Sequence, residues 1–286
     1  MITRGVSHGA ITVINAIPCG IGATVGVELR TKASFSVRGD RRTVSIVNDE
    51  REDDSMARIC VKNTYEHFRV EEPKGWVLAI DSQIPISRGL KSSSSACNAI
   101  VSAAAGKIMK EHKKKGFENN EEGVLEMIRL GVRCAREANV TITGAFDDAC
   151  GCHLGGLVIT DNRNDMLIGR SEVDKHDVIL LVPAEKIRKP SLSTEAFRNI
   201  SEKVRELVNK VDDDWYSVLT ANGSLVARAV GADNSIARRA MAMGALAAGV
   251  SGTGPAVSVV VKKNEGRSFL RDLEHEGYRA IITRTR

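Results

Sequence analysis

Apolar and polar positions repeat along the chain at two different periods, which separate candidate strands from candidate helices. Positions 10–17 and 24–37 mix small, apolar and β-branched residues around several glycines, a pattern typical of strands. The apolar run from Trp76 to Ile80 predicts a buried strand. From Ala96 to Ile108 the apolar residues recur at helical spacing. The stretch between the last two segments is therefore a connection from a strand into the start of a helix.

The same patterns predict the remaining elements. In the first half we expect a strand at 43–47, a helix at 59–68 and a helix from 124 to 138, with Asn119 and Glu122 as a capping box. In the second half we expect strands at 157–160, 178–182, 256–261 and 279–283, and helices at 201–211, 215–229, 235–248 and 268–276. This interleaving predicts an α+β fold. We place two closely packed domains at 1–156 and 157–286.

Composition narrows the classes of partner. With 286 residues, 42% hydrophobic and 27% charged, the chain can bury a sizeable core. A net charge of +5 suits anionic small molecules, whereas 4% aromatic residues offer little for stacking bases, so we expect no nucleic acid. No apolar run reaches the roughly 18 residues of a membrane span, and no signal peptide is evident. We expect a cytoplasmic protein with no membrane partner and six reduced cysteines.

A serine-rich segment begins the helix that follows Ile80. It consists of Pro85, Ile86, Ser87, Arg88, Gly89, Leu90, Lys91, Ser92, Ser93, Ser94, Ser95 and Ala96. Gly89 allows backbone dihedrals that other residues avoid, and the first helical turn offers free N–H groups and the positive end of the dipole. An ordinary N-cap needs one serine, not four. We therefore predict a phosphate site here.

A second glycine-rich segment, residues 249–256, precedes an apolar strand and is expected to follow a helix. It contains Gly249, Gly252 and Gly254, whereas a tight turn out of a helix would need only one glycine. We predict that the backbone of Gly252, Thr253 and Gly254 approaches a ligand.

These two segments resemble the second and third motifs of the GHMP kinases, a superfamily that includes galactokinase, homoserine kinase and mevalonate kinase. The first motif is matched loosely by Ser7-His8-Gly9-Ala10 and Asn15. Lys91 stands at a position where most of the family has a small residue. A lysine here resembles the motif of the archaeal-type shikimate kinases, which are a branch of this superfamily. The three motifs occur in the order of the family, so the chain is identified by resemblance as a member of this superfamily.

The resemblance implies roles for three further residues. Asp148 stands seven positions before Gly155-Gly156, where the family has its catalytic aspartate. Glu137 stands eleven positions before Asp148, where mevalonate kinase binds magnesium, with Ser93 as the other protein ligand. Taken alone, Glu137 would be a surface charge on a helix and Asp148 a turn residue. We expect the neighbouring Asp147 to act locally, and we leave open which basic residue accompanies Asp148.

The resemblance also implies a fold and an activity. The fold would have two lobes, an N-terminal one like the second domain of ribosomal protein S5 and a ferredoxin-like C-terminal one. The activity would be transfer of the ATP γ-phosphate, with Mg²⁺, to the 3-hydroxyl of shikimate, a step towards chorismate and the aromatic amino acids. Lys91 would add a donor near the leaving group. Homoserine or another small alcohol is the alternative acceptor, and a catalytically silent sensor on the same fold is the third hypothesis.

Overall fold

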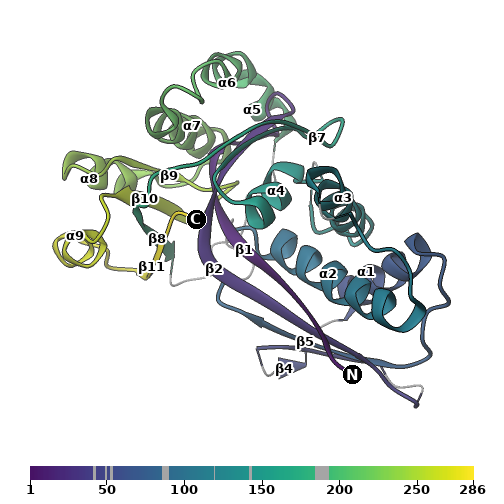
Figure 1. Cartoon of the computed structure of the whole chain (residues 1–286). Helices are drawn as coiled ribbons and strands as arrows, with labels where there is room; N and C mark the ends of the chain where they lie inside the picture. The colour runs from purple at the N-terminus through teal and green to yellow at the C-terminus, as the bar shows by residue number, and fades with distance from the viewer. Residues whose placement is uncertain are drawn as a thin grey trace.

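The computed structural model describes residues 1–40, 43–48, 50–51, 54–85, 90–118, 120–141, 144–183 and 193–286. Within this part of the chain the strands form two sheets, each covered by its own helices (Figure 1). The fold is α+β with two lobes, as the sequence predicts. None of the described helices is both long and apolar enough to cross a membrane.

The first sheet is built around a long antiparallel hairpin. Its strands β1 (Thr3–Ile14) and β2 (Ile21–Val37) pair from Thr3–Phe35 to Ile14–Ala23. The other edge of β2 pairs with β5 (Trp76–Ser82) at one end and with β6 (Leu157–Asp161) at the other. The outer strands are β3 (Thr43–Val47), β4 (Glu50–Arg51) and β7 (Met166–Ser171), giving the order β4-β3-β5-β2-β6-β7 with β1 beside β2.

Four helices pack on one face of this sheet (Figure 1). They are α1 (Ser55–His67), α2 (Ser92–His112), α3 (Glu121–Glu137) and α4 (Phe146–Leu154). Their apolar faces share a core with Phe35, Trp76 and Leu78 of the sheet. One face of α2 is rich in alanine. Because these side chains are small, the helix backbone can pack close to β1.

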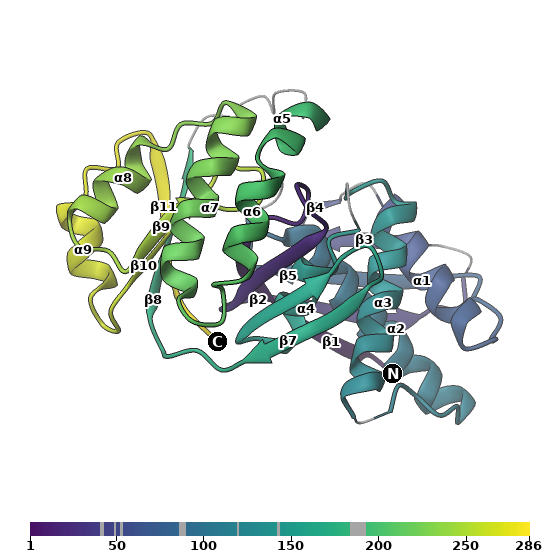
Figure 2. The same ribbon diagram turned by 90° about the horizontal axis from the view of Figure 1, so that it is seen from above.

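The second sheet has the order β11-β8-β10-β9 and is antiparallel throughout. Its strands are β8 (Asp177–Pro183), β9 (Ala247–Val250), β10 (Val257–Val261) and β11 (Tyr278–Arg284). The helices of this half are α5 (Thr194–Asn199), α6 (Ser201–Val208), α7 (Trp215–Val230), α8 (Ser235–Ala242) and α9 (Gly266–Asp272). Figure 2 shows α6 and α7 lying beside the hairpin end of the first sheet.

The structure differs from the sequence prediction at several places, and β7 and α5 are among the elements that had no predicted counterpart. The helix predicted at 235–248 ends at Ala242, because Gly244 has a φ of +95° and the buried alanines after it form β9. The third motif therefore connects two strands. Residues 146–154, which had no predicted structure, form α4. The cap of α3 is Asn120, whose side chain accepts from Gly123 N at 2.8 Å, whereas Asn119 lies outside the described residues.

The sheets themselves divide the chain between Ser171 and Asp177. Both β6 and β7 belong to the first sheet, so that sheet extends to Ser171 and the second sheet begins at Asp177. The domain boundary between residues 156 and 157 stays a prediction.

Candidate active site

Helix α4 carries Asp147 and Asp148 in its first turn and lies directly on the β1–β2 hairpin. Thr24 of β2 donates its hydroxyl to the Asp147 carbonyl at 2.9 Å. Gly151 faces the same threonine, and a Cβ there would overlap Thr24 Oγ1, so only glycine permits this close approach. A carboxylate in the first turn of a helix is stabilised by the positive end of its dipole.

Two arginines bind the other end of α4. Arg170 Nη2 donates to the Leu154 carbonyl at 2.7 Å, and Arg286 Nη2 donates to the His153 carbonyl at 2.6 Å. Cationic side chains near the last carbonyl groups stabilise a helix, because this end of the helix dipole is negative. The short helix is therefore held at its C-terminal end by β7 of the first sheet and by a residue that follows β11 of the second sheet.

Asp148 forms an ion pair with Lys91, with 2.7 Å between Asp148 Oδ1 and Lys91 Nζ. Lys91 is buried and adopts a left-handed backbone conformation, with a φ of +69°, immediately before α2. Asn98 of α2 donates to the Ala149 carbonyl at 2.9 Å, which holds α2 and α4 together close to this pair. The pair joins the second motif to the predicted catalytic aspartate.

The ion pair also determines the charge of Lys91. Burial acts to lower the pKa of Lys91, but the carboxylates of Asp148 and Asp147 outweigh it, so the pKa is raised above the ordinary value. Lys91 is therefore cationic at neutral pH and supplies the basic partner of Asp148 that sequence reasoning left open.

Asp147 lies in a different environment from Asp148. Only 4% of it is exposed, its Oδ1 accepts from Asn162 Nδ2 at 2.6 Å, and Asn162 Oδ1 accepts from Asp147 N at 3.0 Å. The carboxylate lies against Gly22, where a Cβ would be 2.5 Å from Asp147 Oδ2. Burial, and then the charge of Asp148, raise the pKa of Asp147 to about 7. In the structure the contacts of Asp147 are therefore with Asn162 and Gly22, and its local role stays a prediction.

The four serines of the second motif divide into two pairs. Ser92 and Ser93 are half-buried at the start of α2, whereas Ser94 and Ser95 are buried. Among the described residues no side chain caps this helix, and Ser95 N donates to the Lys91 carbonyl at 3.0 Å. The N–H groups of the preceding serines have no intrahelical acceptor. An uncapped N-terminus with two accessible hydroxyls fits the predicted anion site better than an ordinary serine cap.

The rest of the second motif is only partly described. Pro85 and Ala96 are half-buried, and Leu90 is 2% exposed within the core, where it packs rather than meeting solvent. The predicted nucleotide-binding residues Ile86, Ser87, Arg88 and Gly89 lie outside the described residues.

The third motif is a tight loop between β9 and β10. Most of its polar backbone groups form hydrogen bonds within the protein. Gly252 N donates to Thr12 Oγ1 at 2.8 Å, and Gly254 N donates to the Ser251 carbonyl at 3.0 Å. The Gly252 carbonyl accepts from Asn15 Nδ2 at 2.9 Å. Among the three residues predicted to bind nucleotide, Thr253 is the one whose N–H and hydroxyl have no partner in the described part of the chain.

Glu137, predicted to bind magnesium, is exposed at the end of α3 and accepts from Asn63 Nδ2 of α1 at 2.6 Å. A Cβ on Gly131 would lie 2.8 Å from Asn98 Oδ1, and α3 follows α2 after a short connection, so the two helices are antiparallel. Measured from this contact, Ser93 lies about 7.5 Å along α2 and Glu137 about 9 Å along α3, in the same direction. The described residues contain no cluster of three His, Cys, Asp or Glu side chains suited to a metal.

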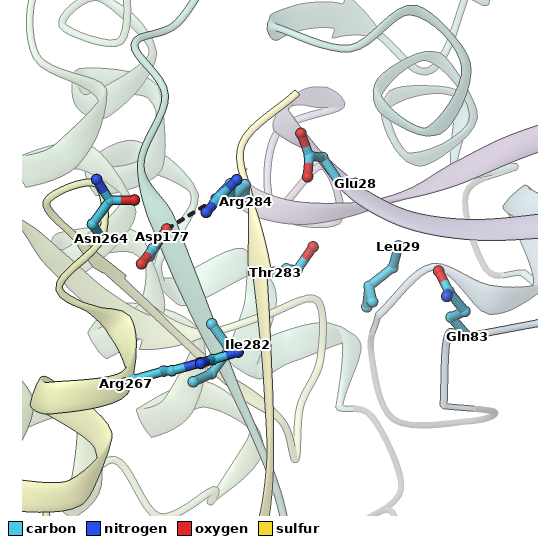
Figure 3. A pocket seen from close by; sticks show the side chains of 9 residues that line it. All are labelled: Glu28, Leu29, Gln83, Asp177, Asn264, Arg267, Ile282, Thr283 and Arg284. Carbon is cyan, nitrogen blue, oxygen red and sulfur yellow. Dashed lines mark hydrogen bonds and ion pairs between the residues drawn. The ribbon is translucent and has the colours of Figure 1, made fainter.

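A polar pocket of about 640 Å³ lies elsewhere, between the two sheets (Figure 3). Its walls come from β2, β8, β11 and the start of α9, and Asp177 Oδ1 lies 3.3 Å from Arg284 Nε within it. None of the residues predicted from the motifs lines this pocket. We therefore assign the candidate active site to the Lys91–Asp148 pair and not to this pocket.

Several residues around the site carried no signal in the sequence. Asn162 stands alone in a turn, and Thr12 and Thr24 are ordinary β-branched strand residues. The sequence marks Lys91 but not its partner, because it does not show that the loop before α2 and the start of α4 meet.

Comparison with known proteins agrees with the overall fold. The family described as GHMP kinases N terminal domain matches residues 56–156. The overall fold resembles the crystal structure of Methanococcus jannaschii mevalonate kinase, with a TM-score of 0.76 and 18% identity over 100% of this chain and 98% of the other. It also resembles Lactococcus lactis galactokinase complexed with galactose, with a TM-score of 0.73 and 14% identity over 99% and 93% of the two chains.

The sequence relatives are more similar. The chain is 35% identical to the shikimate kinase of Methanosarcina mazei, over 98% of this chain and 92% of the relative. It is 34% identical to the shikimate kinase of Pyrococcus abyssi, over 91% and 92% of the two chains. The chain belongs to the GHMP kinase family, as its motifs indicate. Membership of a kinase family implies the use of ATP and a small-molecule acceptor.

Proposed function

We propose that this protein transfers the γ-phosphate of ATP to the 3-hydroxyl of shikimate, giving shikimate 3-phosphate and ADP. The observation that carries the proposal is the Lys91–Asp148 ion pair, 2.7 Å long, at the start of the serine-rich helix. The pair joins a lysine of the kind found at this position in the shikimate kinase branch to the aspartate that corresponds to the catalytic aspartate of the family. The relatives of similar length that are named shikimate kinases support the choice of acceptor.

In this proposal the triphosphate is bound by the N-terminus of α2 and by the third motif. The free N–H groups of the first turn, with the hydroxyls of Ser92 and Ser93, would face the phosphates. Thr253 would contribute its N–H and hydroxyl from the β9–β10 loop, because the N–H groups of Gly252 and Gly254 are already bonded. Phosphoryl transfer depends mainly on such positioning and on neutralisation of charge.

Asp148 would orient the acceptor hydroxyl and take its proton as the new bond to phosphorus forms. A carboxylate is a sufficient base for this step, because the transition state is loose and needs little activation of the nucleophile. Lys91 would keep Asp148 in place, and its ammonium group would add positive charge beside the transferring phosphoryl group. This role adds to the one expected from sequence, in which Lys91 supplies a donor near the leaving group.

Ser93 and Glu137 fit a magnesium ion bound together with nucleotide. Magnesium in kinases usually takes one or two protein oxygens and completes its shell with phosphates and water. The partly accessible hydroxyl of Ser93 and the exposed carboxylate of Glu137, on adjacent helices, would supply these two oxygens. When bound, the ion would supply charge neutralisation on the phosphate oxygens.

The experiment that tests the proposal is an ADP-release assay with shikimate, homoserine, mevalonate and galactose as acceptors. ADP release with shikimate, together with formation of shikimate 3-phosphate, is the expected result. Release with homoserine or another alcohol but not with shikimate would favour the alternative kinase. ATP binding without turnover on any acceptor would favour a sensor, although the Lys91–Asp148 pair argues against this.

A further inference from the structure

Asn222 of α7 lies in the interior between the two sheets and has an unusual environment. It is 1% exposed, and its Oδ1 accepts from the backbone N–H of Asn15 at 3.2 Å. Its Nδ2 is buried without a hydrogen-bond partner in the part of the chain that the structure describes. An unpaired donor in the interior is unfavourable. A position that served packing alone would be better filled by leucine, so the buried amide points to a specific task.

The position of Asn222 is fixed by a close contact between backbones. The next residue, Gly223, faces Gly249 of β9, and a Cβ on Gly223 would lie 2.6 Å from Gly249 Cα. Helix α7 therefore rests directly on β9, the strand that leads into the third motif. Any shift of α7 would be transmitted to the start of that loop.

Asn15 continues the connection from Asn222 to the loop itself. Its Oδ1 accepts from Ile17 N at 2.9 Å, and its Nδ2 donates to the Gly252 carbonyl at 2.9 Å. Both atoms of the side-chain amide are thus engaged, and the main-chain N–H is held by Asn222. A rigid series of hydrogen bonds runs from Asn222 through Asn15 to Gly252.

We propose that Asn222 is a positioning residue for the third motif. By fixing Asn15 it sets the orientation of the Gly252 peptide, and so directs the free N–H and hydroxyl of Thr253 towards the phosphates of the nucleotide. Asn222 itself does not contact the nucleotide. The inference rests on the proposed function only in taking ATP as the ligand of this loop, and it is independent of the acceptor.

The test is ATP affinity measured by calorimetry without acceptor, together with steady-state kinetics. Asn222→Leu removes both polar atoms at similar volume, and Asn222→Ala removes them without added bulk. We expect both variants to weaken ATP binding about tenfold and to raise the KM for ATP similarly, with the acceptor KM unchanged within about twofold. Asn234→Leu is the matched control, because Asn234 also bonds α7, through Ser224 at 3.1 Å, but lies at the start of α8. This control should lower only the Tm.

A double-mutant cycle with Asn15→Ala tests whether the effect passes through Asn15. The double variant should bind ATP no more weakly than Asn15→Ala alone, because both changes break the same series of bonds. Additive losses, or wild-type ATP affinity in both folded Asn222 variants, would overturn the inference. If the wild-type enzyme binds ATP but does not phosphorylate shikimate, the proposed acceptor is wrong, whereas the comparison of ATP affinities still decides the role of Asn222.

Discussion

Thr12 of β1 and Thr24 of β2 are register partners in the central hairpin, and their hydroxyls bond to two different parts of the candidate site. Thr12 Oγ1 accepts from Gly252 N in the third motif at 2.8 Å, whereas Thr24 Oγ1 donates to the Asp147 carbonyl in α4 at 2.9 Å. A rigid pair of strands therefore fixes the distance between the proposed phosphate loop and the helix of the proposed base.

Thr24→Val tests this relationship. Valine keeps the shape of the buried threonine but removes the hydrogen bond to Asp147, so we expect the free energy of unfolding to fall by about 1 kcal/mol. We also expect kcat to fall severalfold, because Asp148 loses part of its support. Thr31→Val is the control, since the hydroxyl of Thr31 lies 2.8 Å from Ser82 Oγ, on the same strand but away from α4. It should lose stability without losing kcat.

Lys91→Met should reduce turnover more than it raises the KM for ATP. Loss of the ammonium leaves the Asp148 carboxylate without its partner at 2.7 Å and removes positive charge from the site. Lys91→Arg keeps the charge and should retain more of kcat than Lys91→Met. A wild-type kcat in the folded Lys91→Met variant would mean that the pair does not serve catalysis.

The two adjacent aspartates should behave very differently. Asp148→Asn keeps the shape but removes the proton acceptor, and we expect kcat to fall about a hundredfold, roughly 3 kcal/mol on the barrier. Asp147→Asn should retain most of kcat, because Asp147 is held by Asn162 and faces Gly22. ATP affinity should be unchanged in both variants. If Asp147→Asn is inactive and Asp148→Asn turns over normally, the assignment is displaced by one residue.

The role of Glu137 is tested by magnesium titration of Glu137→Gln. Glutamine can still accept from Asn63, but one hard anionic oxygen is lost, so activity should fall at limiting magnesium and partly recover at high magnesium. Glu126→Gln on the same helix is the control, because Glu126 lies 3.5 Å from His67 Nε2. Superimposable titrations for Glu137→Gln and the control would show that Glu137 is a surface charge.

Local patterns were sufficient to predict much of the fold. The β-branched alternation of residues 24–37 and the apolar run at 76–80 correspond to β2 and β5, and the apolar face from 124 to 138 corresponds to α3. The helix predicted through Ala248 was wrong because alanine is a strong helix former. Residues 247–250 are extended because they pair with β10 as a buried strand at the edge of the sheet. Local propensity cannot include a partner strand that lies far away in the chain.

The candidate site was predictable where the signal lies in consecutive residues. The serine run, the glycine-rich loop and the spacing from Asp148 to Gly155-Gly156 are all of this kind. The contacts of Lys91 with Asp148, and of Asn15 with Gly252, join residues far apart in the sequence. Burial of the lysine and the crossing of α2 with α4 create the first contact, and the hairpin creates the second. Neither contact can be recognised from the residues next to it in the sequence.

The raised pKa of Asp147 makes a prediction about the stability of the fold at different pH values. The carboxyl has a pKa of about 7 in the folded protein because of burial, and 3.8 is its ordinary value. The folded state therefore retains a proton that the unfolded state loses between about pH 4 and pH 7. Stability from this group is fully present below pH 4 and is lost as pH rises to about 7, by at most about 1.4 kcal/mol per pH unit.

Asp147→Asn removes this titration and keeps an oxygen for Asn162, so the variant should gain stability relative to wild type as pH rises from 4 to 8. His8 and His153 act in the opposite direction, because burial lowers the pKa of each from 6.5 to about 4, and their stability is lost as pH falls. They are present in both proteins, so their contribution cancels in the difference. Urea unfolding of the two proteins at each pH gives this difference directly. A difference that stays constant from pH 4 to pH 8 would show that Asp147 is ionised throughout in the folded protein, with Lys91 near enough to stabilise its charge.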